Sequence, residues 1–153
     1  MPNKIAAAVL GPAESGNSIL QFLGEAAYLW SYRGQLDKSA AIFQALITLA
    51  PNDPVGHQGL AEIYLTQGKF REAEREAQTA SRSTSADRRT TAFAYKLRGR
   101  ALMQLNRLKE AEKALLRASE IDAGGAEGKS ALEILEAARR MGIFPSGTSP
   151  PVK

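Results

Sequence analysis

Few side chains in this sequence have the types and spacing that catalysis requires. His57 is the only histidine, so a histidine pair or a histidine-rich metal site is excluded. We expect His57 to pack between two helices rather than to serve a catalytic triad. The segment 71–76 alternates arginine with glutamate, which favours a solvated, salt-bridged helix face over acid–base catalysis. The sequence therefore predicts no enzyme.

Binding motifs for cofactors and metals are also missing from the sequence. It contains no phosphate-binding Walker loop and no dinucleotide fingerprint. It has no cysteine, so disulfides and thiolate metal sites are excluded. We expect neither a cofactor nor a metal, which leaves the binding of another macromolecule as the chemistry to explain.

The composition predicts one globular domain outside the membrane. The chain has 153 residues, of which 44% are hydrophobic and 24% charged. No apolar run approaches the roughly 18 residues that span a bilayer. The apolar stretch 5–10 is short for a secretory signal and follows a single lysine, so we expect a cytoplasmic protein.

The positive charge is concentrated between residues 69 and 117, which hold 13 basic and 6 acidic residues. Such an excess can attract nucleic acid or an acidic protein, or can form a solvated helix face. Few aromatic residues are interleaved with the arginines, and this disfavours nucleic acid. The basic cluster comprises Arg82, Arg88, Arg89, Arg98 and Arg100.

An internal repeat organises the chain. The segments 30–39, 64–73 and 102–111 each have a large apolar residue, then Gly or Asn four residues on, an apolar residue two later and a small residue three after that. Gly and Asn accept positive φ at low cost, so each should end one helix before a second begins. Apolar residues recur at helical spacing in 36–47 and 108–118, which predicts an all-α fold of helix pairs.

These helix pairs resemble the tetratricopeptide repeat, a unit of 34 residues. The resemblance implies three units, at about 20–53, 54–87 and 92–125, in a short right-handed superhelical stack. About four residues are inserted near 84–91. Within the first unit, Phe43 and Pro51 occupy expected places, and Asp53 and Pro54 should begin the next helix.

The two ends depart from the repeat. Ser130 and Glu133 have the spacing of a capping box, which predicts that they open a final helix covering the last repeat, at about 126–141. We expect a repeat domain over 18–141, a flexible segment at 1–17 and a disordered tail at 142–153.

The repeat pattern also implies which side chains line the concave surface, where peptides lie in such stacks. The inward positions are Gln21, Gly24, Tyr28, Ser31 and Tyr32 in the first unit, Val55, Gln58, Glu62, Leu65 and Thr66 in the second, and Phe93, Lys96, Arg100, Met103 and Gln104 in the third. All except Gly24, Thr66 and Gln104 are expected to contact a peptide. Asparagine is absent from the set, which disfavours a clamp for a terminal carboxylate.

The segments 43–49, 59–61 and 67–73 are similar to the chaperones that serve translocator proteins in bacterial type III secretion. This resemblance implies a chaperone that holds an extended client segment in its groove and dimerises through its N-terminal region. Apolar client side chains would contact Tyr28, Tyr32, Leu65 and Phe93, while Lys96 and Arg100 would meet acidic or backbone groups.

Three alternatives remain open from the sequence. The chain could be a general adaptor that assembles a complex without export, or a nucleic-acid-binding protein. Some of the inward side chains could also pack against the N-terminal segment or against a second copy of the chain, so that they are not free for a client.

Overall fold

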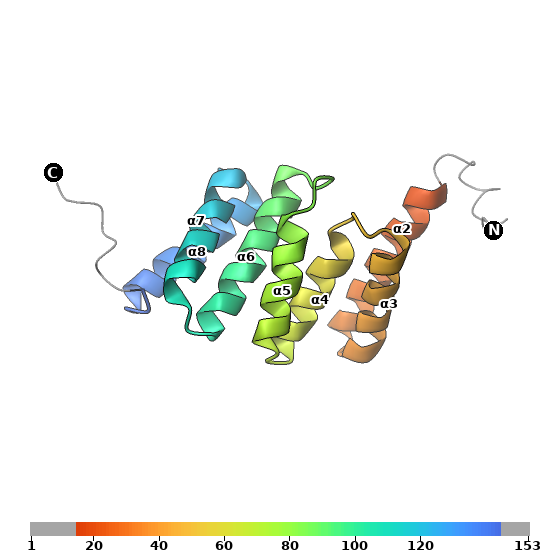
Figure 1. Cartoon of the computed structure of the whole chain (residues 1–153), viewed down its shortest axis with the longest axis horizontal. Helices are drawn as coiled ribbons and strands as arrows, with labels where there is room; N and C mark the ends of the chain where they lie inside the picture. The colour runs from red at the N-terminus through yellow and green to blue at the C-terminus, as the bar shows by residue number, and fades with distance from the viewer. Residues whose placement is uncertain (1–14, 145–153) are drawn as a thin grey trace.

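The computed structural model describes residues 15–144 and shows them as a row of antiparallel helices (Figure 1). These residues form seven helices and no strand, which confirms the all-α prediction. The helices are α2 (Ser15–Tyr32), α3 (Leu36–Leu49), α4 (Val55–Thr66), α5 (Phe70–Ser81), α6 (Arg88–Gln104), α7 (Leu108–Ile121) and α8 (Ala126–Arg140).

The turn between the two helices of each pair contains a residue with positive φ, as the repeat pattern predicts. The φ angles are 76° at Gly34, 74° at Gly68 and 58° at Asn106. At each turn the following backbone N–H reaches a carbonyl five residues back, for example Gln35 to Trp30 at 2.9 Å. Three helix pairs therefore follow one another, α2–α3, α4–α5 and α6–α7, with α8 packed on the last.

A short connection joins the first two units, because α4 begins soon after α3 ends. Helix α3 ends at Leu49, and Pro51 follows its C-cap. Helix α4 begins at Val55 with Pro54 at its N-cap, one residue later than the sequence predicts, and the Asp53 carboxylate accepts a hydrogen bond from Val55 N at 2.9 Å. The buried Ser39 hydroxyl donates to the Ala27 carbonyl at 2.7 Å and so ties α3 to α2.

The four extra residues between the second and third units lengthen a helix. Helix α6 has 17 residues where α4 has 12, and it begins at Arg88, earlier than the unit boundary at 92 predicts. Asp87 caps it by accepting from Thr90 N at 2.7 Å. The linker before it folds back, since the Ser83 and Ser85 hydroxyls donate to the Asn52 carbonyl at 2.7 and 2.8 Å.

The core runs through the stack as three clusters. The first lies between α2, α3 and α4 around Phe43, Leu46 and Leu60. A small middle cluster joins the second and third units around Leu97. The third lies between α6, α7 and α8 around Leu102 and Leu115.

Several predictions about the ends are wrong. Helix α8 begins at Ala126, and Ser130 lies inside it, so the capping box does not form. Its first N–H groups are satisfied instead by Asp122 Oδ2, which accepts from Glu127 N at 3.1 Å and Gly128 N at 3.3 Å. Helix α2 begins at Ser15, inside the segment expected to be flexible.

The segment expected to be a tail contributes to the core at its beginning. Phe144 is 4% exposed and packs in the third cluster. The chain reaches that position after a turn at Gly142, where Ile143 N donates to the Ala138 carbonyl at 2.9 Å. The expectations for 1–14 and 145–153 lie outside the described residues.

The alternating charges of 71–76 form a solvated face only in part, since Arg71 and Arg75 are exposed whereas Glu74 is buried. Glu74 is 8% exposed, and its carboxylate accepts from Arg98 Nε at 2.9 Å across the boundary between units. Glu76 Oε2 lies 2.6 Å from Nδ1 of His57, which confirms that the histidine joins α4 to α5. These carboxylates hold helices together.

Candidate functional site: the face of the first helices

The first helices of successive units lie next to one another and form one continuous face, which we call the first-helix face. Helix α2 contacts α4, α4 contacts α6, and α6 contacts α8. The repeat register brings the inward positions of three units to this face, because they recur at helical spacing on α2, α4 and α6. Two cavities open along it.

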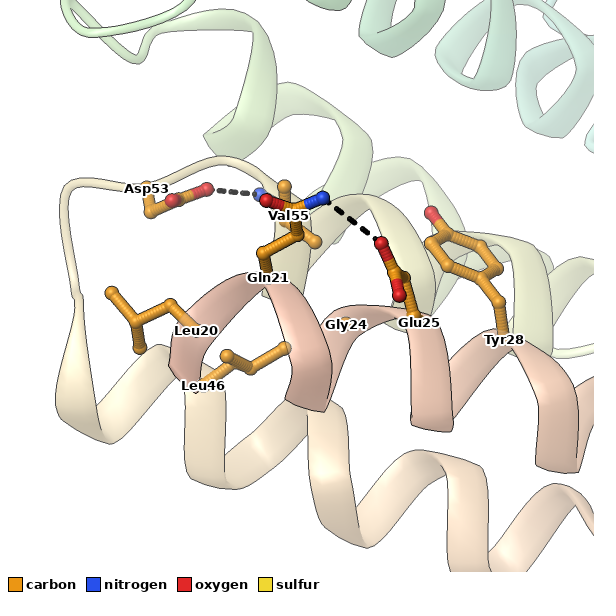
Figure 2. Close-up of a pocket in the computed structure, with 8 residues that line it drawn as sticks. All are labelled: Leu20, Gln21, Gly24, Glu25, Tyr28, Leu46, Asp53 and Val55. Atoms are coloured by element: carbon orange, nitrogen blue, oxygen red, sulfur yellow. Dashed lines mark hydrogen bonds between the residues drawn. The ribbon is translucent and has the colours of Figure 1, made fainter. Parts of the chain in front are cut away.

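The first of these, the N-terminal cavity, has a volume of about 370 Å³ and lies between α2, the end of α3 and the start of α4 (Figure 2). Its lining residues are Leu20, Gln21, Gly24, Glu25, Tyr28, Leu46, Asp53 and Val55. Figure 2 shows Asp53 and Glu25 on the same side of α2, with Gln21 and Val55 between them. The Gln21 amide donates to Glu25 Oε1 at 3.0 Å.

The second, the C-terminal cavity, has a volume of about 280 Å³ and brings together α4, α5, α6 and α8. Its lining residues are Leu65, Phe70, Arg100, Met103, Gln104 and Ile134. Arg100 is exposed and is the only charged residue in this lining. The floor is therefore apolar and contains the adaptable side chain of a methionine.

Polar side chains connect the helices between the two cavities. The Tyr28 hydroxyl on α2 interacts with the Glu62 carboxylate on α4. Glu62 in turn interacts electrostatically with Lys96 and Arg100 on α6. Lys96 Nζ lies 2.5 Å from Glu127 Oε2 and 3.4 Å from the Ser130 hydroxyl on α8.

Burial changes the titration of two of these groups. It raises the pKa of Glu62 above the ordinary carboxyl value, although the charges of Arg100 and Lys96 act in the opposite direction. Burial also raises the pKa of the Tyr28 phenol, and the adjacent Glu62 charge raises it further. At neutral pH the Tyr28 hydroxyl therefore keeps its proton. The ring of Tyr28 packs edge-on against the ring of Phe43, with the two centroids 5.0 Å apart.

The inward positions predicted from the repeat fall into three groups. Gln21, Gly24, Tyr28 and Val55 line the N-terminal cavity, and Leu65, Arg100, Met103 and Gln104 line the C-terminal cavity. Glu62, Phe93 and Lys96 lie between them; Lys96 Nζ is 5.1 Å from the centroid of the Phe93 ring. Lys96 is already paired with Glu127, so Arg100 is the more accessible of the two predicted cations.

The remaining positions are placed differently. Gln58 is 4% exposed, and its amide donates to the Thr90 carbonyl at 2.8 Å, so it ties α4 to α6. Thr66 is exposed, and its hydroxyl donates to the Glu62 carbonyl on its own helix at 3.0 Å. Tyr32 is 88% exposed at the end of α2, and Ser31 beside it is half-buried.

Sequence reasoning missed several residues that line the cavities. Glu25 follows Gln21 by one helical turn, so the helical period could have found it. Asp53 was interpreted only as a helix cap. Phe70 and Ile134 come from α5 and α8, outside the three first helices to which the repeat pattern refers, and carry no signal of their own.

Neither a metal site nor a membrane span is found in the described part of the chain. Residues 15–144 hold no group of three or more His, Asp or Glu side chains that could hold a metal ion. No helix among them is both long and apolar enough to cross a bilayer.

Comparison with known proteins agrees with the helix pairs. Two family models, both described as "Tetratricopeptide repeat", match residues 32–97 and 94–124. The fold is similar to that of the Yersinia enterocolitica type III secretion translocator chaperone SycD, with a TM-score of 0.67 and 22% sequence identity. That match covers 88% of this chain and 98% of the chaperone chain. No curated protein matches the sequence.

Proposed function

Because the chain is a tetratricopeptide repeat protein, and such repeats form protein-binding modules, we propose that it is a chaperone for a segment of a client protein. The client segment is extended and lies along the first-helix face, with apolar side chains in the two cavities. The observation that carries this proposal is the pair of apolar-floored cavities on one continuous face, lined by eight of the inward positions.

Binding in this mode uses burial of apolar area for affinity and polar groups for orientation. Each apolar side chain that enters a cavity contributes about 1.5–3 kcal/mol before the entropy of ordering the segment is subtracted. Two such anchors contribute about 3–6 kcal/mol, which is less than the roughly 8 kcal/mol of micromolar binding, so further contacts along the face must add to them. The contacting residues that we propose are Gln21, Tyr28, Ser31, Tyr32, Val55, Glu62, Leu65, Phe93, Arg100 and Met103, with Gln58 and Lys96 supporting them through their contacts to α6 and α8.

We place this activity in type III secretion, in the bacterial cytoplasm and without catalysis. The fold likeness to a translocator chaperone supports that assignment, together with the segments 43–49, 59–61 and 67–73. The chaperone would keep an apolar client segment from aggregating before export. We also propose a homodimer through α2, where Phe22 and Leu29 are exposed large apolar side chains.

An adaptor that assembles a complex without export is the second candidate, and the two differ in the client. The experiment is to purify the tagged chain from its native cell, identify the co-purified protein, and then express that protein alone and together with the chain. A chaperone's client aggregates alone and is soluble in co-expression. A partner that is fully soluble alone would contradict the chaperone assignment and favour the adaptor.

Single substitutions test where the client binds. Tyr32→Glu places a charge on an exposed position of the first-helix face and should abolish co-purification while the far-ultraviolet spectrum stays unchanged. Leu49→Glu is the matched control, because Leu49 is 62% exposed on the second helix α3. Phe93→Glu is less suitable, since Phe93 packs against the middle core cluster. Equal capture by the Tyr32 variant and the control would refute binding on this face.

A further inference from the structure

The two cavities of the first-helix face carry charges of opposite sign. The N-terminal cavity is lined by the carboxylates of Glu25 and Asp53, and no basic residue lines it. The C-terminal cavity is lined by the guanidinium of Arg100, and no acidic residue lines it. Each cavity thus combines an apolar floor with charge of one sign, which is negative in the N-terminal cavity and positive in the C-terminal cavity.

These charges are available to a ligand. The hydrogen bonds that Glu25 and Asp53 accept come from the neutral Gln21 amide and from Val55 N, so neither carboxylate is neutralised there. The cations nearest Arg100 on α6 are paired, Lys96 with Glu127 and Arg98 with Glu74. Within the described residues, no carboxylate oxygen lies within 4.0 Å of the Arg100 guanidinium, and Glu62 on α4 interacts with it electrostatically without forming an ion pair.

The positions of the two cavities along α4 set a minimum spacing between the client side chains that occupy them. Val55 lines one cavity and Leu65 the other, and both belong to α4, along which their separation is about 15 Å at 1.5 Å per residue. An extended segment advances about 3.3 Å per residue. The cavities are also displaced across the helices, since one lies towards α2 and the other towards α6 and α8, so at least about five residues separate a side chain in one cavity from a side chain in the other.

We propose that the first-helix face selects an extended client segment with two apolar residues at least about five positions apart, a basic residue beside one and an acidic residue beside the other. The basic residue lies at Glu25 and Asp53, and the acidic residue lies at Arg100. Charge complementarity therefore sets the direction in which the segment crosses the face. This inference rests on the proposed function, because it names the chemistry of the client segment.

A displayed library of random 12-residue peptides tests the proposal on the full chain. Wild type should enrich peptides with Lys or Arg next to one apolar residue and Asp or Glu next to another at least about five positions away. The Glu25→Lys variant should select Asp or Glu, where wild type selects Lys or Arg, beside the apolar residue that enters the N-terminal cavity. The Arg100→Glu variant should select Lys or Arg, where wild type selects Asp or Glu, beside the apolar residue that enters the C-terminal cavity. A consensus peptide should bind each variant about two- to five-fold more weakly than wild type, as for partly exposed ion pairs.

Two control variants separate local recognition from the general field of the protein. Asp37→Lys and Arg71→Glu change exposed charges on the second helices α3 and α5 by the same amounts. They should leave the enriched pattern unchanged. Equal shifts in the controls, an enriched pattern without charge order, or a pattern that Glu25→Lys and Arg100→Glu leave unaltered would each overturn the proposal.

Other occupants of the face give different results. If a second copy covers it, peptides are not enriched and Glu25→Lys changes the sedimentation of the protein. If residues 1–14 of the same chain cover it, peptides are enriched only on a variant that lacks them. Either result overturns the proposal. Loss of charge order while Tyr32→Glu still abolishes client capture would refute this inference alone and leave the proposed function standing.

Discussion

The ring of Phe43 on α3 lies directly against the Cα of Gly59 on α4. A Cβ built at Gly59 would be 2.2 Å from Cε1 and Cζ of that ring, which is closer than any real contact. Phe43 is 1% exposed and also packs edge-on against Tyr28. One aromatic ring therefore joins both helices of the first unit to the next unit, and the absence of a side chain at position 59 makes room for it.

Gly59→Ala should destabilise the domain by about 1–3 kcal/mol, because overpacking forces the Phe43 ring to move. Helix propensity alone would change stability by about 1 kcal/mol in the opposite direction, so the sign of the result is decisive. Urea unfolding monitored by circular dichroism measures it. Gly24→Ala is the matched control, since its Cβ would be 3.5 Å from Val55 Cγ1, an ordinary contact, and should stabilise. Stabilisation by both changes would contradict the packing.

Glu74→Gln should lower the free energy of unfolding by about 1–3 kcal/mol, because it leaves the partly buried Arg98 without its anionic partner. The double variant Glu74→Met with Arg98→Met should recover most of that loss, since two apolar side chains replace the pair. Glu110→Gln, which breaks the exposed pair with Arg107, should change stability little. A loss in the double variant as large as that in Glu74→Gln would show that the unpaired charge of Arg98 is not the cause.

The pH dependence of stability should contain a contribution from Glu62 of unusual sign. Its pKa in the folded protein is raised above the ordinary value of 4.5, so the folded state holds the proton more tightly than the unfolded state. The penalty for ionising it is present above the raised pKa and disappears below the ordinary value. Between these limits, lowering the pH should relieve the penalty, and Glu62→Gln should remove this part of the pH profile. Urea unfolding at several pH values tests this, and identical profiles for the two proteins would contradict it.

Asp122→Ala should destabilise the domain by about 1 kcal/mol, because it removes the acceptor for the first N–H groups of α8. Ser130→Ala is the direct comparison, since Ser130 has the sequence signature of a cap but lies within the helix. Its only contact of note is a long one to Lys96 Nζ at 3.4 Å. A larger loss for Ser130→Ala than for Asp122→Ala would reverse the assignment of the cap.

The fold was accessible from the sequence because its signals are local. Gly34, Gly68 and Asn106 mark three turns where only a residue tolerant of positive φ is stable, and the apolar period of the flanking helices follows from the backbone geometry. Eight of the inward positions line the two cavities for the same reason, since a repeat in register brings equivalent residues to one face, and their role in binding stays a prediction.

The features that the sequence did not predict depend on contacts between residues of different helices or turns. Asp122 caps α8 across the turn at Gly124 and Gly125, a spacing that no local capping rule describes. Phe144 is buried only because the chain turns at Gly142 and reaches the third core cluster. Glu74 looks like a surface residue in sequence and is buried because Arg98 of the next unit faces it. In each case the partner lies on another element, and helical periodicity carries no information about it.

The contacts of each helix with its neighbours predict how fast its amide hydrogens exchange with solvent. Helix α2 packs chiefly on α3 and has a smaller contact with α4, whereas α6 is surrounded by α5, α7 and α8. In a linear array, terminal elements open at a fraction of the global free energy. Amide hydrogens of α2 should therefore exchange sooner than those of α6. Since α2 forms one wall of the N-terminal cavity, that cavity loses its shape whenever α2 opens, whereas the C-terminal cavity does not.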